Sequence, residues 1–474
     1  MSYDVLRTLK TKKRKNKKKI SYELSEKTIW PIRDALMYGL LPYLSIRDIR
    51  DCMRIKVFNK IFDREAFWNF YLQKYFSVSD INQVKQYFKY RNVKELARLC
   101  SEIDNMFKNK IYYRVSGSHT KYQTDERRIC NMDQLINLIR LEVNNGNFSN
   151  DLKYRDCSFA LYQLRNLYSL TLDNVKNLYP ENINDLTSLG SLQFYWCENL
   201  ELPILKLPNL KKLTVHSCQL KNLSCLSELT NITDLKLSHN SLTEIDTICR
   251  LKKLENLDLS CNENLRILPH QFSSLQNLKS LQLYNCGIEK IDTICSLTNL
   301  QDLNLYNNKI KSIPSSFGNL NKLIELDMSK NLITNIPFSF GDLKKLEKLL
   351  MSDNKIRDFR NVCRCEKLAV LSLRDNQIEV VPSEVMNLWN LKDLSLSYNK
   401  IWQISKEWII KGTYFQKTER GTEMEGVLDF SHNCITDLKP LNTYAKHLTY
   451  VKIIRLYGNP IINKIKKSTI VLQY

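Results

Sequence analysis

Glycine is scarce in this sequence, with only 11 residues in 474, and none of them belongs to a phosphate-binding loop. Neither G-x-x-x-x-G-K-[S/T] nor G-x-G-x-x-G occurs, which excludes the two common glycine-rich nucleotide loops. The six histidines are scattered, and His216 and His239, whose spacing could bring them together, have no third metal ligand. We therefore expect a protein that is not an enzyme and that uses no cofactor and no metal.

Long apolar segments are also missing. No run of about 18 apolar residues occurs, so the sequence predicts no membrane span. The basic N-terminus has no apolar segment behind it and does not fit a secretory signal. The 14 cysteines are not spaced as a disulfide framework, and Cys363 and Cys365 lack a second pair at zinc spacing. Reduced cysteines are typical of cytoplasmic or nuclear proteins, and we expect one of these locations.

Positive charge is concentrated at the N-terminus of a chain whose formal net charge is +21. Between Arg7 and Lys19 there are nine lysines and arginines and no acidic residue. Such a run repels itself and cannot form a core, so residues 1–20 are predicted to be a disordered tail. The tail is either a nuclear-localisation or nucleic-acid-binding patch or simply a solvated end.

The most informative feature is an internal repeat that begins near residue 135. Its pattern is L-x-x-L-x-L-x-x-N-x-I-x-x-I, and one instance consists of Leu300, Leu303, Leu305, Asn308, Ile310 and Ile313. The asparagine position recurs at residues 240, 262, 308, 331, 354, 376, 399, 433 and 459, and Cys197, Cys218 and Cys286 fill it elsewhere. Most steps are 21 to 24 residues, which gives about thirteen repeats and one degenerate candidate at Leu135–Val143.

Each position of the repeat has a physical role. The L-x-L segment has period two, which predicts a short strand with its leucines turned inward. An inward asparagine can donate to and accept from the backbone of adjacent turns, and a cysteine is its smaller substitute. A second apolar set, such as Phe317 and Leu320, forms the far side, so the stack is expected to curve with its strands on the concave face. The 34-residue step from Asn399 to Asn433 predicts a loop near residues 411–426.

These residues closely resemble the leucine-rich-repeat family. The segments Ile313–Leu323 and Ile336–Leu346 read I-P-x-x-F-G-x-L-x-x-L or a close variant, as in its plant-type and intracellular signalling-type repeats, and Leu456–Pro460 is similar to its closing repeat. The resemblance implies an α/β fold over residues 131–474. It would be a leucine-rich-repeat solenoid, a horseshoe with a parallel concave sheet and a C-terminal cap. Its function would be to bind protein.

Residues 21–130 lack the repeat and are predicted to form a small all-helical domain, because apolar residues recur three or four positions apart. The stretch Leu36–Tyr71 resembles an F-box, although Trp30-Pro31 replaces the usual Leu-Pro and the opening is about two residues too long. The residues that match are Leu40, Leu44, Ile49, Phe58 and Trp68. This resemblance implies docking to the adaptor of a cullin-type ubiquitin ligase, with the repeats recognising the substrate. The alternative is a scaffold or signalling regulator whose helices only cap the solenoid.

The predicted partner site is the concave face. Large aromatic residues at exposed strand positions are favoured as interface anchors, although tyrosine is common in this chain, which has 24. Acidic residues outnumber basic ones at these positions between residues 254 and 375, so a protein is expected to bind there and a nucleic acid is not. The candidate residues are Tyr195, Trp196, Tyr284, Tyr306, Tyr398, Asp302 and Glu325.

Overall fold

The computed structural model describes residues 140–144, 165–175, 180–198, 200–403, 426–438, 451–462 and 471–473. All of them belong to the larger of two compact units of the chain. The predicted tail at residues 1–20 and the predicted helical region at residues 21–130 lie outside the described residues. So do the five F-box-like residues (Leu40, Leu44, Ile49, Phe58 and Trp68) and all but the last residue of the predicted loop at 411–426.

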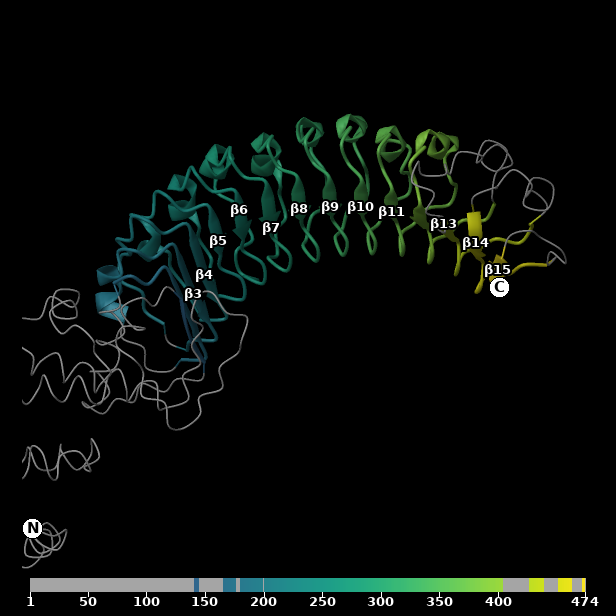
Figure 1. Ribbon diagram of the computed structural model, residues 1–474. Helices are drawn as coiled ribbons and strands as arrows, with labels where there is room; N and C mark the ends of the chain where they lie inside the picture. The colour runs from purple at the N-terminus through teal and green to yellow at the C-terminus, as the bar shows by residue number, and fades with distance from the viewer. Residues whose placement is uncertain are drawn as a thin grey trace, which may run out of the picture. The chain divides into compact units, whose positions relative to one another are not determined.

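The described strands form one sheet of 15 strands in which each strand pairs in parallel with its neighbours in sequence order. This confirms the parallel sheet that the repeat predicts, and Figure 1 shows the strands side by side along one curved stack. The strands are β1 (Arg140–Asn144), β2 (Ser169–Asp173), β3 (Ser191–Tyr195), β4 (Lys212–His216), β5 (Asp234–Lys236), β6 (Asn256–Asp258), β7 (Ser280–Gln282), β8 (Asp302–Asn304), β9 (Glu325–Asp327), β10 (Lys348–Leu350), β11 (Val370–Ser372), β12 (Asp393–Ser395), β13 (Gly426–Asp429), β14 (Val451–Arg455) and β15 (Val471–Gln473).

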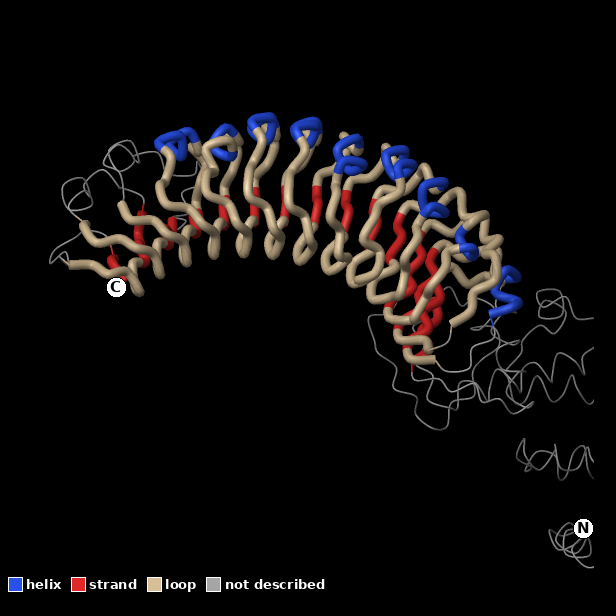
Figure 2. The backbone as a smooth tube through the Cα atoms, turned by 180° about the vertical axis from the view of Figure 1, so that it is seen from behind, coloured by secondary structure: helices blue, strands red, loops and turns tan. Residues whose placement is uncertain are grey.

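Short 3-10 helices return the chain on the opposite side of the repeats, along the outer edge of the curve in Figure 2. A strand packs closer to its neighbour than a helical turn does, so this arrangement makes the strand side concave. The helices are η3 (Pro180–Asp185), η4 (Ser224–Leu226), η5 (Asp246–Arg250), η6 (His270–Ser274), η7 (Asp292–Ser296), η8 (Ser315–Asn319), η9 (Phe338–Asp342), η10 (Val362–Arg364) and η11 (Ser383–Asn387).

The core lies between the strands and the 3-10 helices. The strand leucines alternate with outward residues, and Leu303 and Leu326 are at most 1% exposed. On the helix side Phe317 of η8 and Phe340 of η9 are fully buried, with parallel rings whose centres are 5.9 Å apart. The second apolar set of the repeat therefore forms the far wall of the core, as its sequence position predicts.

The asparagine ladder is present at the predicted positions. In one example the Asn331 amide donates to the carbonyl oxygens of Leu305 (2.9 Å), Met328 (3.0 Å) and Ser329 (3.2 Å), and its oxygen accepts from the Ile310 N–H (3.0 Å). Where cysteine takes this place the thiol keeps only the donor role, as in the 3.2 Å contact from Cys286 Sγ to the Leu259 carbonyl. The asparagine thus satisfies backbone groups of two successive turns that have no water to bind.

Three features extend or correct the repeat read from sequence. Strand β1 shows that the degenerate segment before residue 144 does join the sheet. Strand β15 follows the predicted closing repeat at Leu456–Pro460 and pairs with β14, so the sheet continues by one strand past the expected cap. A second, exposed row of asparagines occupies the turn before several of the strands, where Asn299 donates to the Gln276 carbonyl at 2.8 Å. The same contact is made by Asn209, Asn231, Asn277 and Asn390.

Candidate interaction surfaces

The concave face of the solenoid, called the strand face below, is the solvent-facing side of the sheet. It carries Asp302, Asn304 and Tyr306 of one repeat and their equivalents in the others. Tyr284 and Tyr306 occupy equivalent positions on it and are each half-buried, but they turn in opposite directions. Tyr284 interacts with Cys261 of the preceding repeat, and burial raises the pKa of the Tyr284 hydroxyl. Tyr306 instead lies under the ammonium group of Lys330 in the following repeat, with 5.3 Å between Nζ and the ring centre.

The carboxylates of the strand face are largely engaged with neighbouring side chains. Asp302 accepts hydrogen bonds from the Ser280 hydroxyl (2.8 Å) and the Gln282 amide (2.6 Å). Glu325 pairs with Lys348 at 3.4 Å, and that pair is exposed. The two predicted acidic residues are therefore held in place across adjacent strands, and both remain at the surface.

Part of the acidic character of this face has a structural cause that the sequence analysis did not identify. An aspartate or asparagine at the last residue of the strand accepts the N–H of the residue two positions later, as Asp327 of β9 does from Ser329 at 2.8 Å. Asn304 does the same for Tyr306 at 3.0 Å, and Asp258 for Ser260 at 3.0 Å. These side chains close the turn after β6, β8 and β9, and the spacing D-x-S or N-x-Y is the sequence signal for it.

One residue after β2, β3 and β4, and three residues after each strand from β5 to β13, the chain takes a left-handed backbone conformation. The N–H of this residue extends the parallel ladder, as in the 3.0 Å bond from Trp196 to the His216 carbonyl. Asparagine, aspartate and histidine tolerate a positive φ better than other residues, whereas tryptophan and tyrosine rarely adopt it. The residues at this position are Asn174, Trp196, Ser217, His239, Cys261, Asn285, Asn307, Lys330, Asp353, Asp375, Tyr398 and His432.

We call these left-handed residues the end row, because they lie where the strands end. Two of the predicted concave-face residues, Trp196 and Tyr398, belong to it. Their φ angles are +55° and +56°, and their side chains are 56% and 41% exposed. Trp196 meets the His216 ring edge-on at 5.4 Å. Tyr398 stacks on His432 at 4.1 Å and carries the guanidinium of Arg374 at 4.5 Å on its ring. The structure therefore places Trp196 and Tyr398 in this end row, whereas Tyr195 lies at the end of β3, at the strand-face position equivalent to that of Tyr284 and Tyr306.

At one point of the end row two negatively charged side chains lie next to each other. Asp353 and Asp375 come from successive repeats and interact directly. Partial burial is the main cause of a raised pKa at the Asp353 carboxyl, and the nearby Asp375 raises it further, while Lys330 and Arg374 oppose the shift. This is the most negatively charged part of the end row, and a cationic group of a partner would relieve the repulsion.

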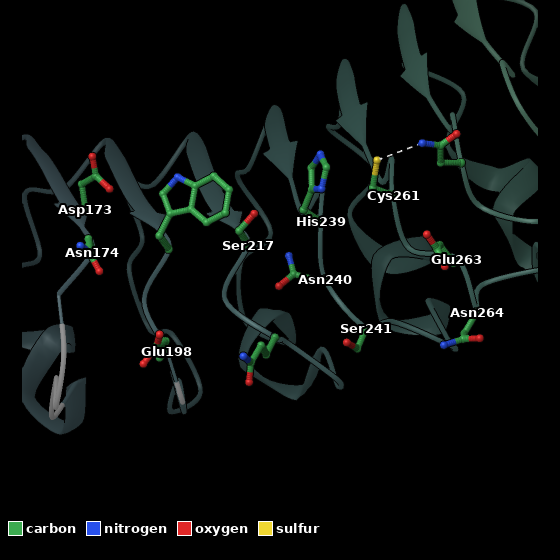
Figure 3. Close-up of a pocket in the computed structure, with 13 residues that line it drawn as sticks. Asp173, Asn174, Glu198, Ser217, His239, Asn240, Ser241, Cys261, Glu263 and Asn264 are labelled. Carbon is green, nitrogen blue, oxygen red and sulfur yellow. Dashed lines mark hydrogen bonds between the residues drawn. The ribbon is translucent and has the colours of Figure 1, made fainter.

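A groove runs below the end row at the N-terminal half of the described repeats. It has a volume of about 930 Å³ and is open to solvent. Figure 3 shows its labelled residues in two rows, with Asp173, His239 and Cys261 nearer the strands. Glu198, Ser241 and Asn264 form the row on the other side. Sequence analysis did not predict this groove, because it is formed by residues just before and just after the asparagine position in several repeats.

His216 and His239 do come together, as their spacing suggested, with 4.9 Å between ring centres. Burial and the neighbouring His239 lower the pKa of His216, and its Nδ1 lies 2.9 Å from the Ser238 hydroxyl. Among the residues whose placement the structure gives, no three His, Cys, Asp or Glu side chains are arranged to hold a metal ion. Within the same ranges no helix has the length and apolar character needed to cross a lipid bilayer.

Comparison with known proteins identifies the repeats. Residues 266–408 match the family described as a leucine-rich repeat region, and residues 253–275 match a single leucine-rich repeat. The search of curated protein sequences finds no match. Many solved structures share the fold.

Three of these similar structures come from different organisms. An internalin from Listeria monocytogenes is 20% identical and aligns over 83% of this chain and 98% of its own, with a TM-score of 0.57. A leucine-rich-repeat protein from Leptospira interrogans is 25% identical over 77% of this chain and 93% of its own, with a TM-score of 0.57. The ectodomain of a plant membrane receptor kinase from Arabidopsis thaliana is 23% identical over 70% of this chain and 46% of its own, with a TM-score of 0.53.

The register of the strands, the buried asparagine ladder and these matches agree with one another. The likenesses establish the fold. The described repeats are leucine-rich repeats arranged in a solenoid, and residues 253–408 match the models of that family.

Proposed function

We propose that this protein is a non-catalytic protein-interaction module that holds its partner on the strand face between β7 and β11. The observation that carries the proposal is the pair Tyr284 and Tyr306, which shares the strand face with the carboxylates of Asp302, Glu325 and Asp327 in a protein whose formal net charge is +21. Rigid aromatic rings with a polar edge are typical anchors of protein interfaces. The acidic surroundings favour a partner whose contact surface is basic or neutral.

The fold is compatible with this role. The related Arabidopsis ectodomain was solved in complex with Casparian strip integrity factor 2. A phosphate backbone would meet the carboxylates of Asp302, Glu325 and Asp327, so a nucleic acid is a poor ligand for the strand face.

The test begins with a photoreactive residue at position 306, which identifies the partner by crosslinking. With the purified partner, changing Tyr284 and Tyr306 together to Ala is expected to weaken binding by about 2 kcal/mol or more, the usual effect of truncating an anchor. Phe338→Ala is the matched control, because Phe338 is an exposed aromatic residue on η9, away from the strand face. Equal affinities of the double variant and the wild type, with crosslinks only to the helix side, would refute the proposal.

The finer proposal concerns residues 21–130. We infer from the F-box-like residues that this region docks to the adaptor of a cullin-type ubiquitin ligase and that the repeats bring in a substrate. If so, the full chain captures the purified adaptor, and Leu44→Ala loses most of that capture while Glu325→Gln, on the strand face, keeps it. A folded full chain that captures no adaptor would instead favour a scaffold whose N-terminal region only caps the solenoid.

A further inference from the structure

The groove at the edge of the solenoid differs from the strand face in position and in chemistry. Residues of the end row form one wall, and residues that follow the asparagine position form the other. The first wall receives one residue from each of six successive repeats: Asn174, Trp196, Ser217, His239, Cys261 and Asn285. Neighbouring parallel strands lie about 4.8 Å apart, so the groove is about 24 Å long.

These dimensions suit an extended peptide. A chain in β conformation advances about 3.3 Å per residue, so about seven residues fill the groove from end to end. Asn240, which also lines the groove, already has its own hydrogen-bond partners. Its amide donates to the Val215 carbonyl, and its oxygen accepts from the Leu220 N–H. Ser217, Gln219 and Ser241 line the groove and offer short polar groups to a peptide backbone. A peptide can therefore lie along the groove without breaking the ladder beneath it.

The charge of the lining selects the side chains of such a peptide. Asp173, Glu198 and Glu263 contribute carboxylates, and no lysine or arginine is among the lining residues that the structure describes. This composition stands out in a protein whose lysines and arginines exceed its acidic residues 71 to 50. Cationic side chains spaced along the peptide each gain from the nearest of these carboxylates, whereas a phosphate or carboxylate ligand is repelled.

Trp196 adds a second recognition element of a different kind. Its ring is more than half exposed although its backbone is fixed by the N–H bond to the His216 carbonyl and by the edge contact with the His216 ring. A guanidinium or ammonium group over an indole face is a favourable pair, and indole is the best of the three aromatic side chains for it. Trp196 lies one repeat from Asn174 and two from His239, so it stands inside the length of the groove.

We propose that this groove binds an extended segment of a partner protein that carries arginine or lysine side chains, one of them over Trp196 and others near Glu198 and Glu263. The segment lies across the repeats, along the edge of the solenoid. This site does not depend on the strand-face interaction, since its lining shares neither tyrosine of the pair Tyr284 and Tyr306.

The test uses the full chain and a fluorescein-labelled nine-residue peptide in which arginine and alanine alternate. Its binding is measured by fluorescence anisotropy at 150 mM salt. Changing Glu198 and Glu263 together to Gln is expected to weaken binding about tenfold, since two partly exposed ion pairs are lost with no change in side-chain size. The control changes Asp302 to Asn and Glu325 to Gln, which removes the same charge from the strand face and leaves the affinity unchanged.

A second variant tests the tryptophan. Trp196→Asn removes the ring but places at φ +55° a residue that tolerates this conformation, so the repeat stays folded. It is expected to weaken peptide binding about tenfold, the scale of a partly desolvated cation–π contact. Thermal melting of each variant reports on folding.

Several outcomes overturn the proposal. If the groove variant (Glu198 and Glu263 to Gln) and the strand-face control lose the same affinity for the peptide, the attraction is a diffuse electrostatic one and the groove is not a binding site. Equal binding of a peptide of alternating glutamate and alanine removes the charge argument. An arginine peptide that shows no saturable binding to the wild type at millimolar concentration excludes the groove as a peptide site.

Discussion

Phe340→Ala is expected to destabilise the solenoid by about 3–5 kcal/mol, the usual cost of deleting a buried phenylalanine ring. The Phe340 side chain is fully buried on η9, and its ring stacks on that of Phe317 from the preceding repeat at 5.9 Å. Deletion leaves a cavity between two repeats. A solenoid has only contacts between neighbours to hold such a junction together.

The matched control lies two residues away. Phe338 is 69% exposed and carries the Arg364 guanidinium on its ring at 3.8 Å. Phe338→Ala therefore loses one exposed cation–π contact, of about 0.5–1 kcal/mol, and no core packing. Urea denaturation followed by circular dichroism measures both variants. A Phe340 variant no less stable than the Phe338 variant would show that the helix-side wall contributes little to the stability of the stack.

The sequence predicted the fold of the repeats well because each buried position repeats with the same spacing. Leu303, Asn308 and Phe317 recur in the same order, and a pattern repeated so often leaves one register in which all inward positions are apolar or satisfied. The substitution of cysteine for asparagine at Cys286 was also predictable, because a thiol fills the same inward position with one weak donor.

The candidate sites were predicted less completely, since surface geometry depends on contacts between repeats. Tyr284 and Tyr306 share a position, but Tyr284 interacts with Cys261 of the preceding repeat and Tyr306 with Lys330 of the following repeat. Trp196 was assigned to the concave face by its place before Cys197, yet β3 ends at Tyr195 and the left-handed turn moves the indole to the edge. No pattern within one repeat states which neighbour a side chain will meet.

The same limit applies to the groove. Its walls combine residues from successive repeats, and each repeat alone has an ordinary polar turn. The acidic character of the described lining is visible only once Asp173, Glu198 and Glu263 are seen to share one surface. The row of non-glycine residues with positive φ gave a partial signal, because asparagine, aspartate and histidine are frequent there, but tryptophan and tyrosine are not expected at such positions.

Asn331→Leu is expected to destabilise the protein by about 1–3 kcal/mol, since it leaves buried backbone groups without partners. The Asn331 side chain is 5% exposed. Its oxygen is the acceptor for the Ile310 N–H, which leucine cannot replace, and its amide joins the carbonyls of Leu305 and Met328 in two successive turns. The added methyl groups of leucine must also fit where a planar amide lies.

Two further variants separate the loss of hydrogen bonds from the change in shape. Asn331→Cys keeps one thiol donor, as the contact from Cys286 to the Leu259 carbonyl shows is possible at this position, so its stability should fall between those of wild type and Asn331→Leu. Asn299→Leu removes an asparagine of the second, exposed row, where water replaces the lost bond to the Gln276 carbonyl, and it should cost less than Asn331→Leu. Calorimetric melting ranks the variants. If Asn331→Leu and Asn299→Leu have the same melting temperature, the buried ladder is not what holds successive turns in register. The stack must then be stabilised by its leucines and phenylalanines alone.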